Sequence, residues 1–362
     1  MKKYISLILV LALWIGLTGY AWLKPADASS DSERRPLEQF PEFSVKTVLS
    51  GRFMKDFADY AVDQFPLRDS WRTLNAWLTY YGLGQKDNNG IYLHDGYAAK
   101  MEYPLKDTSV DFAIDRFHDL YEMYLGDVED IYFLAVPDKS YYMAEDAGVL
   151  SMDYDALFEK LAQELDFAEF IDITDCLTME SYYRTDTHWR QEKLLPVMEK
   201  LGQIMGLEIP TDYVEKTATD RFYGVYYGQA ALPMPAEELK WMTWEGLENV
   251  QVQILDNGTF TTVYNEQKLS SKDPYESFLS GNVAIQVVEN PNAASDRHLV
   301  LFRDSFGSSI APLLSRSYSK ITLVDTRYIN PAMVGQFVDF EGAEVLFLYS
   351  TLILNTSSAL RK

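Results

Sequence analysis

The sequence has almost no cysteine and few basic residues. Cys176 is the only cysteine in 362 residues, so no internal disulfide can form, and we expect its thiol to be a buried structural group. Lys and Arg number 32 against 54 Asp and Glu, for a formal net charge of -22. Nucleic acid and flat binding to anionic lipid both require a basic surface, so this charge balance argues against both.

Histidine is also scarce, which narrows the possible metal chemistry. The four histidines are His94, His118, His188 and His298. They include no His-x-x-x-His pair, and there is no pair of cysteines. Asp186, His188 and Asp304 are a weak candidate ligand set, so we expect no metal and no cofactor.

One long apolar run begins near the N-terminus. It extends from Ile5 to Leu23, about 19 residues, and follows two lysines. This length suits a membrane span better than the shorter core of a cleaved signal peptide. Residues 1–24 therefore predict a signal anchor in the cell membrane, with the remainder outside the cytoplasm because the positive charge precedes the span. The small residues Ala26-Asp27-Ala28 leave open cleavage near Ala28 and secretion.

Residues 25–41 are polar and contain proline, which predicts a tether. Residues 42–362 predict one α/β domain. Apolar spacings of three and four predict helices at 45–63 and 67–81, and an Asp-Gly turn predicts a hairpin at 90–97. From about residue 110, helical patterns alternate with short apolar strands, which favours a mainly parallel sheet covered on both faces.

The pattern changes between about residues 212 and 282, where aromatic-rich loops predominate. A hairpin is expected there, with 250–255 paired to 260–264. We interpret the segment as an insertion over the catalytic edge of the sheet. Its aromatic side chains either stack on sugar rings or pack the insertion itself, and both readings stay open. These side chains are Tyr223, Tyr226, Tyr227, Trp241 and Trp244.

A serine stands where a predicted strand turns into a helix. Residues 298–302 are apolar and suit a central strand, and a helical pattern begins after Ser305. Ser305 is thus expected at the carboxyl edge of the sheet, beside helix amides that attract developing negative charge. An ordinary helix-capping serine, with Asp304 as a turn former, is the alternative.

Two of the four histidines have an aspartate two residues earlier, His188 after Asp186 and His298 after Asp296. His298 opens a predicted strand and is expected to meet solvent, which leaves His188 as the candidate base. Asp186 could hold one ring nitrogen of His188 and fix its tautomer, which would leave the other nitrogen to take a proton from Ser305. A buried histidine with no catalytic role is the alternative.

Several motifs together resemble the DHHW family, which is related to the alginate O-acetyltransferase group. They are Asp63-Gln64-Phe65-Pro66-Leu67-Arg68, Pro137-Asp138-Lys139, Thr185-Asp186-Thr187-His188-Trp189, Gly281-Asn282 and Arg303-Asp304-Ser305-Phe306. The resemblance implies an SGNH-hydrolase-like, three-layer α/β/α fold with a circularly permuted motif order. It covers most of the chain from about residue 41.

The resemblance also implies roles for individual residues. Ser305 would be the nucleophile, His188 the general base and Asp186 its orienting partner. Gly281-Asn282 resembles in type the glycine and asparagine that line the oxyanion hole of SGNH enzymes, and backbone amides near Ser305 are the other candidates. Arg303 stands where the SGNH pattern has glycine and could narrow the pocket.

Three functions are compatible with these residues. The first is an exported, membrane-anchored O-acyltransferase, most simply O-acetyl, acting on a cell-surface polysaccharide. The family resemblance implies a separate membrane-bound O-acyltransferase as the partner that supplies the acyl donor. The second is a carbohydrate esterase with the same triad, and the third is a non-catalytic scaffold of a polysaccharide-modification complex.

Overall fold

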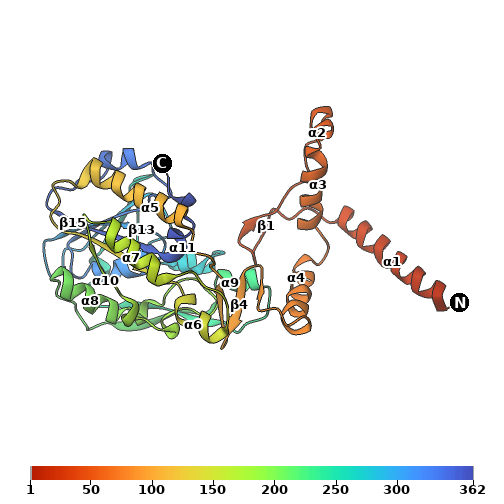
Figure 1. Cartoon of the computed structure of the whole chain (residues 1–362), viewed down its shortest axis with the longest axis horizontal. Coiled ribbons are helices and arrows are strands. Elements are labelled where there is room, and N and C mark those ends of the chain that lie inside the picture. The colour runs from red at the N-terminus through yellow and green to blue at the C-terminus, as the bar shows by residue number, and fades with distance from the viewer. Residues whose placement is uncertain (1, 362) are drawn as a thin grey trace. The chain divides into compact units, whose positions relative to one another are not determined.

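The computed structural model in Figure 1 describes residues 2–361. The chain forms two compact units: unit 1 comprises residues 1–89 and 227–233, and unit 2 comprises residues 90–226 and 234–362. These boundaries differ from the expected division, because residues 42–89 group with the N-terminal helix rather than with the α/β domain.

Unit 1 is built mainly from helices. Its elements are α1 (Lys2–Leu23), β1 (Ser29–Ser30), β2 (Arg35–Pro36), α2 (Val45–Leu49), α3 (Arg52–Asp63), α4 (Arg68–Trp77), a π-helical turn at Leu78–Gly82, and β3 (Asp87–Asn88). The single helix expected at 45–63 is two helices, because Gly51 has φ +74° and interrupts the α-helical hydrogen bonding. Within residues 2–361, α1 is the one helix long and apolar enough to cross a membrane.

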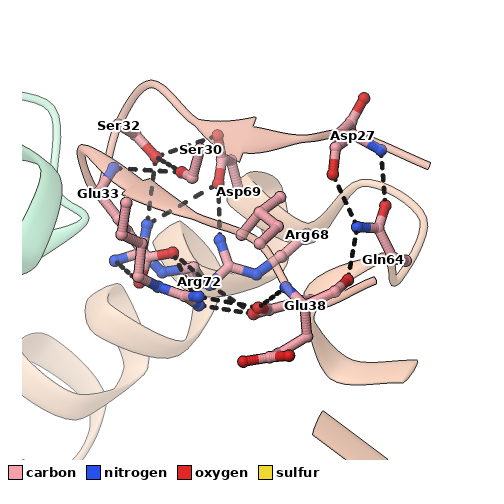
Figure 2. Close-up of polar contacts among 12 residues, drawn as sticks. Asp27, Ser30, Ser32, Glu33, Glu38, Gln64, Arg68, Asp69 and Arg72 are labelled. Carbon is pink, nitrogen blue, oxygen red and sulfur yellow. Dashed lines mark hydrogen bonds and ion pairs between the residues drawn. The ribbon is translucent and has the colours of Figure 1, made fainter. Parts of the chain in front are cut away.

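The segment expected to be a tether is folded. β1 and β2 pair as an antiparallel hairpin. The Gln64 side chain donates to Asp27 O (2.9 Å) and Glu38 O (3.1 Å) and accepts from Asp27 N (2.8 Å), as Figure 2 shows. Residues 25–41, whose polar composition resembles a linker, are therefore held by hydrogen bonds within unit 1.

Unit 2 contains an eight-stranded sheet with the order β11-β10-β12-β14-β13-β15-β6-β7. The five strands from β14 to β7 are parallel, and the other three pair antiparallel. The bounds are β6 (Ile131–Val136), β7 (Glu169–Phe170), β10 (Gln251–Ile254), β11 (Thr259–Thr261), β12 (Ile285–Glu289), β13 (His298–Arg303), β14 (Lys320–Val324) and β15 (Ala343–Ser350). The expectation of a mainly parallel sheet is confirmed.

Helices cover both faces of this sheet. They are α5 (Asp107–Leu120), α6 (Ser140–Ala147), α7 (Tyr154–Glu164), α8 (Leu195–Met205), α10 (Gly307–Leu314) and α11 (Thr351–Leu354), and α9 spans Val225–Ala230. All six residues of β6 are buried, and successive side chains face opposite sides. Leu134 lies in one apolar core with residues of α8 and α10, whereas Phe133 lies in another with residues of α5 and α7. The result is a three-layer α/β/α arrangement.

Two hairpins lie outside the parallel strands. β4 (Ile91–His94) pairs with β5 (Tyr97–Lys100) across the expected Asp-Gly turn. β8 (Val214–Phe222) pairs with β9 (Glu237–Thr243). The shorter turns of unit 2 are a π-helical turn at Tyr121–Leu125 and 3₁₀ turns at Thr174–Cys176, Met179–Ser181, Gln191–Lys193, Leu247–Asn249, Glu266–Ser270, Pro274–Ser277, Pro331–Gln336 and Ser357–Ala359.

The aromatic-rich segment is only partly an insertion. The expected hairpin forms as β10 and β11, but these strands extend the main sheet. Tyr226, Trp241 and Trp244 are buried, and Trp241 stacks on Tyr264 with ring centroids 5.0 Å apart. Packing rather than sugar stacking therefore accounts for these three rings, whereas Tyr223 is exposed.

Candidate active site

Ser305 lies directly after β13, at the carboxyl edge of the parallel strands. The buried Asp304 carboxylate holds this turn, because Oδ1 accepts from Phe306 N (2.9 Å) and Oδ2 accepts from Ser350 N (2.8 Å). Two adjacent strands, β13 and β15, are thereby joined at the point where the serine emerges. Asp304 acts on the backbone, and both of its oxygens accept amide hydrogen bonds.

The structure brings Ser305, His188 and Asp186 together. The Ser305 Oγ and His188 Nε2 atoms are 2.7 Å apart although 117 residues separate them in the chain. His188 Nδ1 lies 2.5 Å from Asp186 Oδ2. A carboxylate can only accept, so Nδ1 carries the proton and Nε2 accepts from the serine hydroxyl. This tautomer is the one that a histidine base requires.

Aromatic side chains hold the imidazole in this position. The Tyr275 ring stacks on His188 with centroids 3.8 Å apart and planes 5° from parallel, and its hydroxyl bonds to Ser309 Oγ (2.8 Å). The Trp189 indole donates to the same Ser309 oxygen (2.9 Å). The histidine segment is thus attached to α10, the helix that follows the serine.

A buried lysine and a half-buried glutamate hold the backbone before Asp186. The Lys139 Nζ donates to Ala98 O (2.5 Å), Tyr183 O (2.6 Å) and Arg184 O (3.2 Å). The Glu237 carboxylate accepts from Arg184 N (2.8 Å), Thr185 N (2.9 Å) and the Thr185 hydroxyl (2.8 Å). Burial lowers the pKa of Lys139 to about 7.

The peptide at Gly224 and Val225 packs against Asp186 itself. Val225 N donates to Asp186 Oδ1 (2.8 Å), and Gly224 N donates to the Thr185 hydroxyl (2.9 Å). A Cβ atom at Gly224 would lie 2.2 Å from the Asp186 Cβ and 2.4 Å from Thr185 O. Only glycine allows this close approach of the two segments.

Arg303 is fully buried and is directed toward the expected oxyanion residues. Its Nη1 donates to Asn282 Oδ1 (2.8 Å) and Ser308 Oγ (3.0 Å), and Nη2 donates to Gln286 Oε1 (3.2 Å). A guanidinium can only donate, so the Asn282 amide oxygen must face Arg303. The Asn282 Nδ2 group, which is a donor, then points away from Arg303. Gly281 precedes it with φ +96°.

The backbone near Ser305 offers one further donor. The amides of Phe306, Gly307 and Ser308 already donate within the turn, to Asp304 Oδ1, Asp304 O and Ser305 O. Across residues 2–361, the Ser305 amide has no such acceptor. The same residues contain no group of three or more His, Cys, Asp or Glu side chains placed to hold a metal ion.

We compared the sequence and the structure of this chain with those of known proteins. No protein-family model and no curated protein matches the sequence. Among solved structures, a DHHW family protein from Eubacterium siraeum matches with a TM-score of 0.61 and 17% identity, over 76% of this chain and 97% of that chain. This chain shares the fold of that protein. Bacillus cereus PatB1, solved with a sulfonyl adduct, matches with a TM-score of 0.59 and 18% identity, over 75% and 97% of the two chains.

The shared fold agrees with the family resemblance that the motifs carry.

No pattern in the sequence marks Tyr275, Glu237 or Gly224 as part of the site. A glycine followed by tyrosines in an aromatic-rich loop and a glutamate at a strand start carry no spacing that marks them as neighbours of a distant histidine.

Proposed function

We propose that this protein is an exported serine O-acyltransferase, most simply an O-acetyltransferase, that modifies a cell-surface polysaccharide through an acyl-enzyme at Ser305. One observation carries the proposal: the continuous hydrogen-bonded chain from the Ser305 hydroxyl through His188 to Asp186. Such a chain activates a hydroxyl at neutral pH.

The first half-reaction forms the acyl-enzyme. Ser305 Oγ attacks the acyl carbonyl carbon while His188 Nε2 takes its proton, and Asp186 stabilises the imidazolium that results. The Ser305 amide and Asn282 Nδ2 are the proposed donors to the tetrahedral oxyanion. When the intermediate collapses, the bond from carbon to the donor's leaving group breaks and the leaving group receives the proton from His188.

The second half-reaction transfers the acyl group. His188 removes the proton of a sugar hydroxyl, whose oxygen attacks the acyl carbon of acyl-Ser305. The ester bond to Ser305 breaks, and Oγ regains a proton from His188. Water in place of the sugar would make the same residues an esterase, so the acceptor that reaches the acyl-enzyme decides between the two activities.

The wider proposal covers location and partners. α1 anchors the protein in the cell membrane, with unit 2 outside the cytoplasm, where cell-surface polysaccharide is available. A membrane-bound O-acyltransferase supplies the acyl group across the membrane. The motif order aspartate, histidine, serine is a circular permutation of the usual SGNH order. Support comes from the apolar length of α1 and from the resemblance to the alginate O-acetyltransferase group.

The full-length protein with an activated acetyl ester tests this proposal. We expect a burst of released alcohol, acetylated oligosaccharide when an acceptor is added, and covalent labelling of Ser305 by a sulfonyl fluoride. Ser305→Ala should lower ester cleavage by about 10³-fold or more, whereas Ser358→Ala, an exposed serine in unit 2, should not. Hydrolysis that oligosaccharide never diverts would favour the esterase. Inertness shared by the wild type and Ser305→Ala would favour the scaffold.

A further inference from the structure

Helix α4 of unit 1 is amphipathic, but its apolar side faces outward and its charged side faces inward. Its outward stripe is apolar: Leu74, Trp77 and Tyr81 in the following turn have 46%, 53% and 66% of their surface exposed. Its inward stripe is charged, since the side chains of Arg68 and Arg72 are only 15% and 18% exposed. A helix that faces water has the opposite arrangement.

The inward charges are paired within unit 1, which explains why they can be buried. Arg68 forms an ion pair with Glu33, and Arg72 lies 3.4 Å from the same carboxylate, as Figure 2 shows. Arg72 also donates to Gly228 O (2.8 Å). Asp63, at the end of α3, accepts two hydrogen bonds from Arg35 (2.5 and 2.8 Å). Because these contacts fix the inward side of α4, its apolar side must face outward.

Helix α3 adds a second apolar surface. Phe53, Phe57 and Tyr60 follow one another at spacings of four and three, and Phe40 packs edge-on against all three with ring centroids 5.4 to 6.3 Å apart. Met54, beside this stripe, is exposed. The opposite side of α3 carries charged residues, among them Asp59.

These aromatic rings share an apolar cavity with α1. The cavity has a volume of about 440 Å³ and is lined by Trp14, Leu17 and Ala21 of α1 together with Phe40, Phe57 and Tyr60. Trp14 lies nine residues before the end of α1, which corresponds to roughly 13 Å along the helix axis. The α3 rings therefore lie beside the outer half of the candidate membrane span.

The net charge of residues 1–89 differs from that of the rest of the chain. Residues 1–89 contain 11 Lys or Arg and 10 Asp or Glu, whereas the remaining residues contain 21 and 44. A strongly acidic surface is repelled by anionic headgroups, but a nearly neutral surface rich in tryptophan, tyrosine and phenylalanine suits the interfacial layer of a bilayer.

We propose that the apolar sides of α3 and α4 lie in the outer interfacial layer of the bilayer that α1 crosses, so that unit 1 docks on lipid as well as being anchored in it. This inference rests on the membrane anchoring proposed above. Lipid is the occupant because the surface continues onto the unburied span of α1.

Spin labelling of the full-length protein in phosphatidylcholine nanodiscs tests the inference. The chain has one native cysteine, so Cys176→Ser gives a background for single labels at Met54→Cys, Leu74→Cys and Leu78→Cys. Leu78 lies one turn after Leu74 and is 47% exposed. Asp59→Cys, on the charged side of α3, is the matched control, and Ile15→Cys reports the anchor. Collisions with oxygen, which concentrates in lipid, are compared with collisions with a water-soluble nickel chelate.

We expect the ratio of oxygen to nickel collisions at positions 54, 74 and 78 to exceed that at position 59 several-fold, with position 15 higher still. If position 15 is in lipid but positions 54, 74 and 78 match position 59, the docking inference is wrong and the anchor stands. If position 15 is also in water, the anchor itself is wrong. Labels at 74 and 78 shielded from both reagents indicate a protein partner and overturn the inference.

Discussion

Asp186→Asn tests whether the carboxylate controls the tautomer of His188. In the wild type, Asp186 Oδ1 accepts from Val225 N and Oδ2 faces His188 Nδ1. The asparagine oxygen must remain toward the Val225 N–H, because its Nδ2 can only donate. Nδ2 then faces His188 Nδ1, so the ring must carry its proton on Nε2. A protonated Nε2 on a neutral ring cannot accept the Ser305 proton.

The magnitude follows from losing the base while keeping the geometry. We expect kcat for acyl-enzyme formation to fall about 10⁴-fold, equivalent to about 5.5 kcal/mol of transition-state stabilisation. Burst kinetics with an activated acetyl ester and the rate of sulfonyl labelling at Ser305 measure it. Circular dichroism should show an unchanged fold, since the two side chains have the same size. A variant that keeps more than about a tenth of the wild-type rate would refute the assigned role of Asp186.

Three further changes probe the groups around Asp186. Gly224→Ala should slow acylation at least about tenfold, because its Cβ would overlap Asp186. Gly126→Ala is the control, since a Cβ there would meet open space. Equal acylation rates in the two variants would contradict the packing argument. The pKa of Lys139 is about 7 in the folded protein and 10.5 in the unfolded chain. As the pH rises from 7 to 9, the folded protein loses this proton and the unfolded chain keeps it, so the free energy of unfolding should rise by up to about 2.7 kcal/mol. Denaturant titrations of Lys139→Met should lack this rise, and an identical rise in that variant would exclude Lys139 as its source. Glu237→Gln removes a charge that accepts three hydrogen bonds and turns an NH₂ group toward an amide donor, so we expect about 2 kcal/mol of destabilisation. Glu238→Gln, its exposed neighbour, should have little effect. A similar loss in both variants would argue against the role of Glu237 in holding the backbone before Asp186.

The sheet and the meeting of Ser305 with His188 could be predicted because both follow from local signals. An apolar strand, a turn and a helix fix where Ser305 emerges, and alternating strands and helices bring the carboxyl ends of parallel strands to one edge. The aspartate two residues before His188 and the DHHW resemblance together select one histidine of four. None of these steps requires knowledge of long-range packing.

The surroundings of the site could not be predicted for a physical reason. Tyr275 reaches His188 from an irregular segment with no periodic pattern, and its ring position depends on packing of the whole segment. The inward position of the charged residues in unit 1 could not be predicted from the hydrophobic pattern either. Arg68 and Arg72 make α4 appear to be an ordinary surface helix until their partner Glu33, in a segment that reads as a linker, is found beside them.

The last strand of the chain closes the middle of the sheet. β15 lies between β13 and β6, and its final residue supplies the Ser350 amide to Asp304. A polypeptide synthesised from its N-terminus cannot join the two halves of the sheet before residues 343–350 have emerged. The turn that carries Ser305 is therefore held in place only after residues 343–350 have been synthesised, and a translation product that stops earlier lacks the contact between Asp304 and Ser350.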